Sequence, residues 1–129
     1  MMMVVGAIVW AMVSCQESLA DKSEREAVEY TRKKCPARID KNTTIDSLVF
    51  DKRTLTMHYY YTMSGNGDNP ELLRQVDARQ VLLDKVRNST SLKKYKDAGF
   101  NFAYIYFSEK HRGDTLFSTV ITRADYSGK

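Results

Sequence analysis

Residues 100–108 read FNFAYIYFS, and this stretch decides which fold the chain can adopt. Successive side chains of a β-strand point to opposite sides. The two sides here are Phe100, Phe102, Tyr104 and Tyr106 on one, and Ala103, Ile105 and Phe107 on the other. Both are apolar or aromatic, whereas a sheet with helices on only one face should alternate apolar with polar residues. The second side must therefore be covered, either by the N-terminal helix of the chain or by a partner.

Three other stretches, 44–50, 54–63 and 115–122, are also rich in β-branched and aromatic residues, which is typical of strands. Residues 51–53 join the first two closely enough for a hairpin, and 109–114 form the turn of a second hairpin. In 54–63 the natural core side consists of Leu55, Met57, Tyr59 and Tyr61, and the opposite side includes His58 and Tyr60.

The remaining segments have helical signals. Residues 17–34 are polar helix formers that stop at Cys35–Pro36, because proline disfavours helix at the residue before it. Asn69 and Pro70 have the types expected at the N-cap and first position of a helix. Its apolar face consists of Leu72, Leu73, Val76, Leu82, Leu83 and Val86. Arg79 falls on that face, so we expect it to extend outward or to meet an acid such as Asp125. A short helix, 91–98, ends at Gly99.

The resulting element order, α-ββ-αα-ββ, predicts an α+β fold. Two hairpins separated by helices most simply form a four-stranded antiparallel sheet with helices on one face. We expect three segments: a signal peptide at 1–14, a lipidated N-terminus and short tether at 15–22, and a single domain at 23–126. The chain of 129 residues is too short for a signal segment and two ordinary domains.

Composition excludes several classes of function. Lys and Arg total 20 against 16 acidic residues, a mild basic excess without the clustered basic face typical of nucleic-acid binders. The sequence lacks Cys-x-x-Cys, His-Glu-x-x-His, calcium-loop and phosphate-loop patterns, so it predicts neither a metal site nor a cofactor.

The N-terminal segment predicts export. Met3–Val13 is a run of eleven apolar or glycine residues, whereas a membrane-spanning helix needs about 20 and a signal peptide about 7–15. The run ends in Met12-Val13-Ser14-Cys15, followed by polar residues. The alternatives are an ordinary cleaved signal, a short anchor, or a buried element of the fold.

Residues 12–15 resemble the lipobox of bacterial lipoproteins. The resemblance implies cleavage before Cys15, a diacylglyceryl group on its thiol and acylation, such as palmitoylation, of its new amino group. Two or three acyl chains give stable membrane attachment. Gln16 stands where inner-membrane lipoproteins tend to have Asp, so the resemblance favours the outer membrane of a bacterial cell envelope.

Cys35 and His58, with an acid such as Asp46, are the residues from which a thiol-dependent hydrolase could be built. Cys35 sits at the end of a helix, not at the positive N-terminus that lowers a thiol pKa, and cysteine is among the most buried residue types. We therefore expect a packed thiol, with a disulfide or a reactive thiol as alternatives.

The sequence favours a non-enzymatic binding or assembly module of the envelope. Tyrosine is enriched at interfaces, and the candidate binding face consists of His58, Tyr60, Tyr104 and Tyr106. We expect a protein partner, a second copy of the chain or a flat ligand there, besides the membrane through the lipid. The alternatives are the hydrolase above and an inhibitor of an envelope enzyme that acts through the loop 64–69.

Overall fold

A computed structural model of the chain describes residues 17–128, so the predicted signal peptide and Cys15 lie outside the described part. Helix α2 (Leu19–Lys34) opens this part, and Ser18 caps it by accepting a hydrogen bond from the Asp21 N–H at 3.1 Å. The helix starts inside the segment 15–22 that we expected to be a tether, and it ends before Pro36 as predicted. Within residues 17–128, no helix is long and apolar enough to cross a membrane.

Three strands follow: β1 (Ala37–Asp40), β2 (Thr43–Asp51) and β3 (Thr56–Met63). The predicted hairpin of 44–50 with 54–63 is confirmed, because β2 and β3 pair antiparallel. Strand β1 was not predicted, since its four residues, ARID, are half charged and show no strand pattern of their own. It pairs antiparallel with β2 at the edge of the sheet.

The predicted long helix is interrupted. After the short 3-10 turn η1 (Gly65–Gly67), the chain forms α3 (Pro70–Gln75) and α4 (Ala78–Asn88). Asn69 is the predicted N-cap, and its Oδ1 accepts from the Glu71 N–H at 2.9 Å. The break lies at Asp77, whose φ of 51° is left-handed and whose side chain caps α4 by accepting from the Gln80 N–H. A left-handed residue cannot continue a right-handed helix.

The chain ends with α5 (Lys93–Asp97), β4 (Asn101–Ser108), β5 (Thr115–Ile121) and α6 (Arg123–Ser127). Strands β4 and β5 form the second predicted hairpin. Gly99 has the positive φ, 80°, expected after a helix end. Helix α6 was not predicted, and it begins with a capping box between Thr122 and Asp125.

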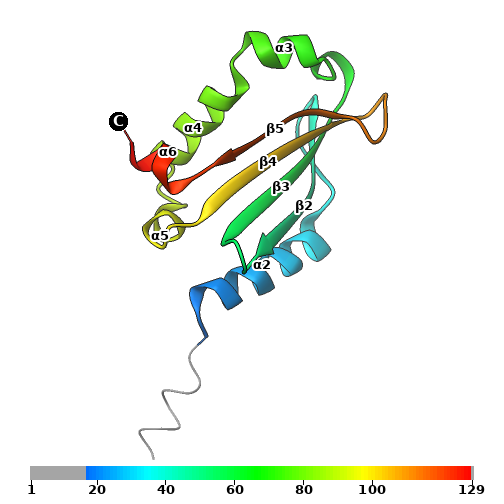
Figure 1. The fold of residues 1–129 in the computed structure, drawn as a ribbon. Coiled ribbons are helices and arrows are strands. Elements are labelled where there is room, and N and C mark those ends of the chain that lie inside the picture. The colour runs from blue at the N-terminus through cyan, green and yellow to red at the C-terminus, as the bar shows by residue number, and fades with distance from the viewer. Residues whose placement is uncertain (1–16, 129) are drawn as a thin grey trace, which may run out of the picture.

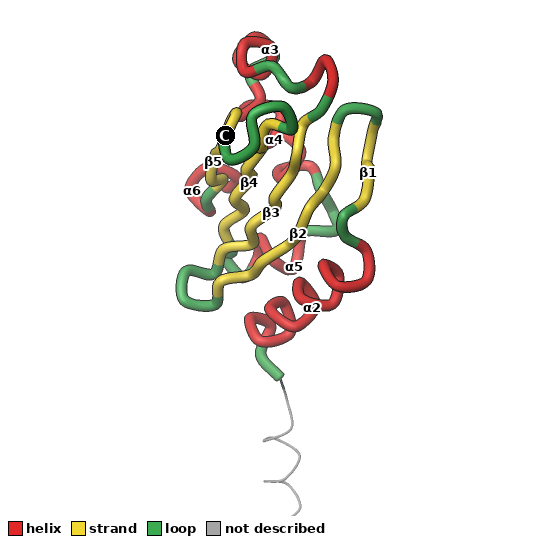
Figure 2. The backbone as a smooth tube through the Cα atoms, turned by 90° about the vertical axis from the view of Figure 1, so that its right-hand side faces the viewer, coloured by secondary structure: helices red, strands yellow, loops and turns green. Residues whose placement is uncertain are grey.

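The sheet has five strands in the order β1-β2-β3-β4-β5 and is mixed, which corrects the prediction of four antiparallel strands. Its central pair, β3 and β4, is parallel, with Tyr59 opposite Tyr104. Parallel neighbours need a crossover connection, and α3, α4 and α5 supply it. Figure 2 shows the five strands side by side in this order.

The core side predicted for residues 54–63 is confirmed, and on 100–108, whose two sides the sequence did not distinguish, the side of Phe100, Phe102 and Tyr104 enters the core. Among the most buried residues are Met57, Tyr61, Phe100, Phe102 and Tyr104. The helices add Ala27 of α2 and Leu82 and Val86 of α4 to the same cluster. Helices α4, α5 and α6 gather beside the β4–β5 half of the sheet, whereas α2 lies beside β2 (Figure 1). Within residues 17–128 the helices thus leave the opposite side of the sheet, here called the outer face, without a second layer.

Candidate functional site

The outer face carries half of the predicted binding face. His58 and Tyr60 of β3 stack with their rings 6.1 Å apart, and Tyr60 stacks on Phe107 of β4 at 6.2 Å. The His58 Nδ1 lies 3.3 Å from the Val49 carbonyl. At the level of His58, Val49 lies opposite it on β2 and Val120 lies two strands away on β5, and these valines are 49% and 48% exposed. The outer face therefore presents an aromatic row bordered by exposed valines.

The other half of the predicted face lies on the core side. Tyr104 is 2% exposed and stacks on Tyr59 at 4.8 Å, and Tyr106 stacks on Tyr61 at 4.7 Å. Side chains alternate along β4, so Tyr104 and Tyr106 point away from the face that holds His58 and Tyr60. The structure thus does not bring the four residues together on one surface.

The stacked tyrosines are neutral core residues at physiological pH. Burial raises the pKa of both Tyr59 and Tyr106 to about 12, and it raises the pKa of Tyr61 and Tyr104 further. They pack against Tyr30 of α2 and Tyr95 of α5 within the core. Tyr59, Tyr61 and Tyr104 therefore have a structural role, whereas Tyr106 is only half-buried.

Cys35 and His58 do not form a catalytic pair. The Cys35 thiol follows α2 and packs partly buried against the core, whereas His58 projects from the outer face. Burial raises the pKa of the thiol, and the nearby Asp46 carboxylate raises it further. A raised pKa leaves less thiolate, which is the nucleophile. Within residues 17–128 no group of three or more His, Cys, Asp or Glu side chains is arranged to hold a metal ion.

The loop at 64–69 is tied down by hydrogen bonds on both sides. Asn42 Nδ2 donates to the Ser64 carbonyl at 2.9 Å. The Asp68 carboxylate accepts from the Ser108 hydroxyl and from the Lys110 N–H, both at 2.9 Å. These hydrogen bonds hold the pKa of Asp68 below its ordinary value. The loop is thus part of the framework at this end of the sheet.

A groove between α4 and β1 is lined mainly by apolar side chains. It has a volume of about 310 Å³. Thr43, Met63 and Tyr106 belong to the strands beneath it. Its sides include Ile39 and Asp40 from β1, Leu73 and Val76 from α3 and its C-cap, and Ala78, Val81, Leu82 and Lys85 from α4. We call this surface the α4–β1 groove.

The rim of the α4–β1 groove is unusually exposed for apolar residues. Ile39, Val76 and Val81 are 55%, 51% and 56% exposed. Leu72, which lies on the short helix α3, is 39% exposed. Sequence reasoning missed this surface, because it joins β1, which has no strand signal, to a helix that turns at Asp77. The sequence signal that could have pointed to this surface is a pair of valines, Val76 and Val81, which are five residues apart and lie on either side of that turn.

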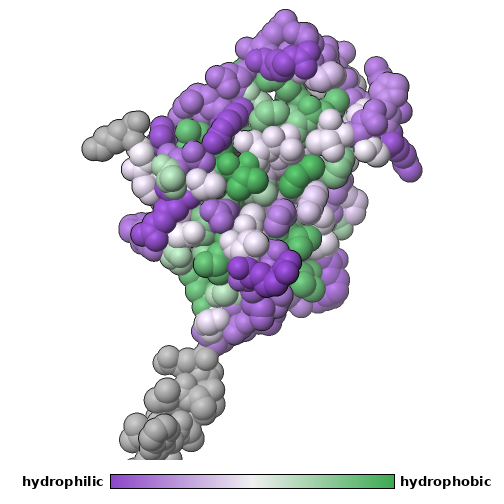
Figure 3. Space-filling view, in the orientation of Figure 1, coloured by the Kyte–Doolittle hydropathy of each residue, from purple (hydrophilic) through white to green (hydrophobic). Residues whose placement is uncertain are grey.

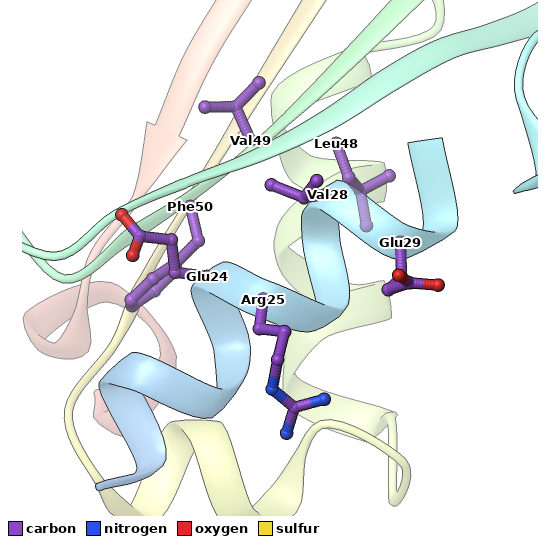
Figure 4. Close-up of a pocket in the computed structure, with 7 residues that line it drawn as sticks. All are labelled: Glu24, Arg25, Val28, Glu29, Leu48, Val49 and Phe50. Atoms are coloured by element: carbon purple, nitrogen blue, oxygen red, sulfur yellow. The ribbon is translucent and has the colours of Figure 1, made fainter. Parts of the chain in front are cut away.

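A second hollow of about 390 Å³ lies between α2 and β2. Val28 of α2 points toward β2 beside Leu48, whereas Arg25 points away from the strand (Figure 4). Charged side chains, Glu24, Arg25 and Glu29, make up much of its lining. Arg25 is bound to Glu17 at 2.9 Å and Glu29 to Lys33 at 3.1 Å, so this hollow has a solvated, ion-paired rim.

Two solved structures share this fold. A candidate secreted protein of Pseudomonas aeruginosa has a TM-score of 0.67 at 15% identity, over 86% of this chain and 99% of that one. A pilotin from the type 2 secretion system of Vibrio vulnificus has a TM-score of 0.61 at 10% identity, over 84% of this chain and 91% of that one. At these identities the likeness shows the fold alone.

No curated protein sequence matches this chain. A family does match, over residues 18–117, which include every strand of the sheet except the last part of β5. The chain therefore belongs to the family described as "Domain of unknown function (DUF8479)".

Proposed function

We propose that this chain is an exported, lipid-anchored protein of the bacterial cell envelope that binds a segment of a partner protein in the α4–β1 groove and catalyses no reaction. The observation that carries the proposal is the concentration of exposed apolar side chains there. Of seven large apolar residues exposed within 17–128, Ile39, Val76 and Val81 line this groove and Leu72 lies on α3 beside it.

Burying these side chains is the driving force for binding. Full burial of a valine or isoleucine is worth about 1.5–3 kcal/mol relative to leaving it in water. Clusters of exposed apolar residues mark interaction sites on soluble domains. Lys85 and Asp40 at the rim offer one positive and one negative group to fix the orientation of the partner. An amphipathic helix with an apolar face is the kind of segment that such a groove accepts.

The fold likeness agrees with an assembly role in the envelope. One similar structure is a pilotin of a secretion system and the other is a candidate secreted protein. A lipid on Cys15 would hold the domain at a membrane, with α2 beginning only four residues later at Leu19. The hydrolase alternative is less well supported, because Cys35 packs against the core whereas the His58 ring lies beside the Val49 carbonyl.

The groove can be tested by photo-crosslinking in the native envelope. A photo-reactive amino acid at position 81 should give one discrete adduct, to be identified by mass spectrometry. Val76→Asp should abolish this adduct by placing a charge in the groove. Val28→Asp is the matched control, because Val28 is 60% exposed on α2, away from the groove, and should leave the adduct unchanged. Adducts at position 81 that survive Val76→Asp would contradict the proposal.

The lipid anchor needs its own experiment. Intact mass and membrane partitioning of the full chain should be compared with Cys15→Ala in a bacterium that processes lipoproteins. An acylated mass that starts at Cys15 and is lost in the variant would support the anchor. An unmodified mass starting at Met1 would remove it, while leaving the groove to be judged separately.

The aromatic row of the outer face favours a second candidate, binding of a flat ligand such as a glycan. The rings of His58, Tyr60 and Phe107 are nearly parallel, with interplanar angles of 9° and 5°. Titration with cell-wall glycan fragments, followed by calorimetry, should show binding that Tyr60→Ala removes. Binding that is unchanged in Tyr60→Ala would argue against this face.

A further inference from the structure

Strand β5 leaves one edge of the sheet open. Its seven residues, Thr115–Ile121, read TLFSTVI and include neither a charge nor a proline. Natural proteins protect edge strands by shortness, charge, proline or a covering element. The opposite edge is protected in this way, because β1 has only four residues and includes Arg38 and Asp40. The β1 edge of this sheet is therefore protected against pairing with another strand, whereas the β5 edge has no such protection in its sequence.

The hydrogen bonds of β4 identify the open groups of β5. The Asn101 N–H donates to the Leu55 carbonyl at 2.8 Å. The backbone N–H and C=O groups of the odd-numbered residues of β4 therefore point toward β3. The backbone groups of the even-numbered residues then point toward β5, as the hydrogen bond from the Ser108 N–H to the Asp114 carbonyl shows. Tyr104 pairs with Thr119. By the alternation of an antiparallel ladder, Ser118 and Val120 turn their N–H and C=O groups away from the sheet.

These outward groups have no partner in the described part of the chain. Neither Ser118 nor Val120 makes a hydrogen bond beyond the β4–β5 ladder within residues 17–128. Their side chains are exposed as well, Val120 to 48%. Where β4 and β5 run in the view of Figure 1, apolar side chains show between the polar ones (Figure 3). Thr122, the next even residue, is already bound by Asp125 and Tyr126 of α6.

We propose that β5 pairs edge to edge and antiparallel with β5 of a second copy of this chain, which joins two five-stranded sheets into one of ten strands. An antiparallel two-fold pairing centred on Ser118 places Ser118 opposite its own copy. In a hydrogen-bonded pair the two residues exchange both N–H···O bonds. Val120 of each copy then lies opposite Leu116 of the other. Because β5 has no charged residue, its pairing with β5 of a second copy brings no like charges together.

The charges at the two ends of β5 favour a copy of the same chain over another protein. Asp114 precedes the strand and Arg123 follows it, and both are exposed. Neither has an ion-pair partner among residues 17–128. The antiparallel register brings Asp114 of one copy opposite Thr122 of the other, one residue from Arg123, once at each end. A two-fold axis makes this complementarity reciprocal.

The α4–β1 groove contributes nothing to this pairing, so the inference stands or fails independently of the proposed function. The full chain, extracted in detergent, should sediment as a dimer in concentration-dependent equilibrium with the monomer. Ser118→Pro removes an outward N–H that the chain's own sheet does not use, a position at which a strand tolerates proline. It should raise the dissociation constant of the dimer roughly tenfold or more, with little change in the unfolding midpoint.

A second variant guards against an effect of proline on folding. Val120→Lys places a charge on the open edge and should also weaken the dimer. Val49→Lys is its matched control, because Val49 is equally exposed at 49% on the same face but lies in β2, inside the ladder between β2 and β3. A chain that stays monomeric at high concentration, or that pairs only with another protein, would overturn the proposal. A dimer that Ser118→Pro and Val120→Lys leave unchanged would also overturn it.

Discussion

The hydroxyl of Thr31 makes two hydrogen bonds to one residue, Leu48. It donates to the Leu48 carbonyl at 2.9 Å and accepts from the Leu48 N–H at 2.8 Å. Strand β1 pairs with β2 only as far as Ile45, so Leu48, which pairs with Tyr59 of β3 on one side, has no neighbouring strand on the side of β1. A side chain of α2 thus takes the place of the missing strand and fixes the helix to the edge of the sheet.

Removing this hydroxyl should destabilise the domain. Thr31→Val is nearly isosteric and leaves the N–H and C=O of Leu48 without a partner, which costs about 1–3 kcal/mol of unfolding free energy. Urea denaturation followed by circular dichroism measures the loss. Thr31→Ser keeps the hydroxyl and should retain most of the stability. A Thr31→Val variant as stable as the parent would show that the hydroxyl contributes nothing.

The left-handed residue Asp77 should tolerate asparagine and reject valine. Its φ is 51°, and a β-branched residue in this region is strained by about 1–3 kcal/mol. Valine also lacks the oxygen that accepts from the Gln80 N–H. Thermal unfolding should therefore rank Asp77→Asn near the parent and Asp77→Val well below it. Asp84→Val, at an exposed helical position of α4, is the control and should cost much less.

The buried tyrosines should make the domain sensitive to alkali. The pKa of Tyr59 is raised from 10.0 to about 12 by burial. Between these values the unfolded chain has lost a proton that the folded chain keeps, so the free energy of unfolding falls as the pH rises. The slope per tyrosine is at most about 1.4 kcal/mol per pH unit. Tyr59→Phe should reduce the slope above pH 10 and leave the pH dependence between 7 and 9 unchanged; an unaltered slope would contradict the assignment.

Asp125 should contribute stability that acid removes. The Thr122 N–H donates to its carboxylate at 2.8 Å and Arg79 lies 3.1 Å away, and together they hold the pKa of Asp125 below 3.8. Because the pKa of Asp125 is lower in the folded chain, its contribution to the free energy of unfolding is complete when the pH is above the ordinary pKa of aspartate. The contribution is lost as the pH falls through the lower pKa of the folded chain. Asp125→Asn should be less stable than the parent at pH 7 by about 0.5–2 kcal/mol. The difference should shrink toward pH 2, and a constant difference would show that charge plays no part.

Local signals made several features predictable from the sequence. Asn69 and Pro70 were predicted to open a helix and do so, because a cap is decided by one side chain and the N–H groups nearest to it. The meeting of Arg79 with an acid was also expected, and its partner is Asp125. Extension of the arginine outward into solvent was the other outcome expected at this position. The candidate binding face was predictable only in part, since alternation separates His58 and Tyr60 from Tyr104 and Tyr106.

The sequence by itself determined the two hairpins, the core side of residues 54–63, the cap that opens α3 and the end of α2 before Pro36. These follow from the periodicity of neighbouring side chains and from short-range capping. The tertiary structure decided the parallel pairing of β3 with β4, the presence of β1 and the composition of the α4–β1 groove. Each depends on which distant segments pack together: a crossover sets the direction of β4, and β1 becomes a strand only because β2 offers it a free edge.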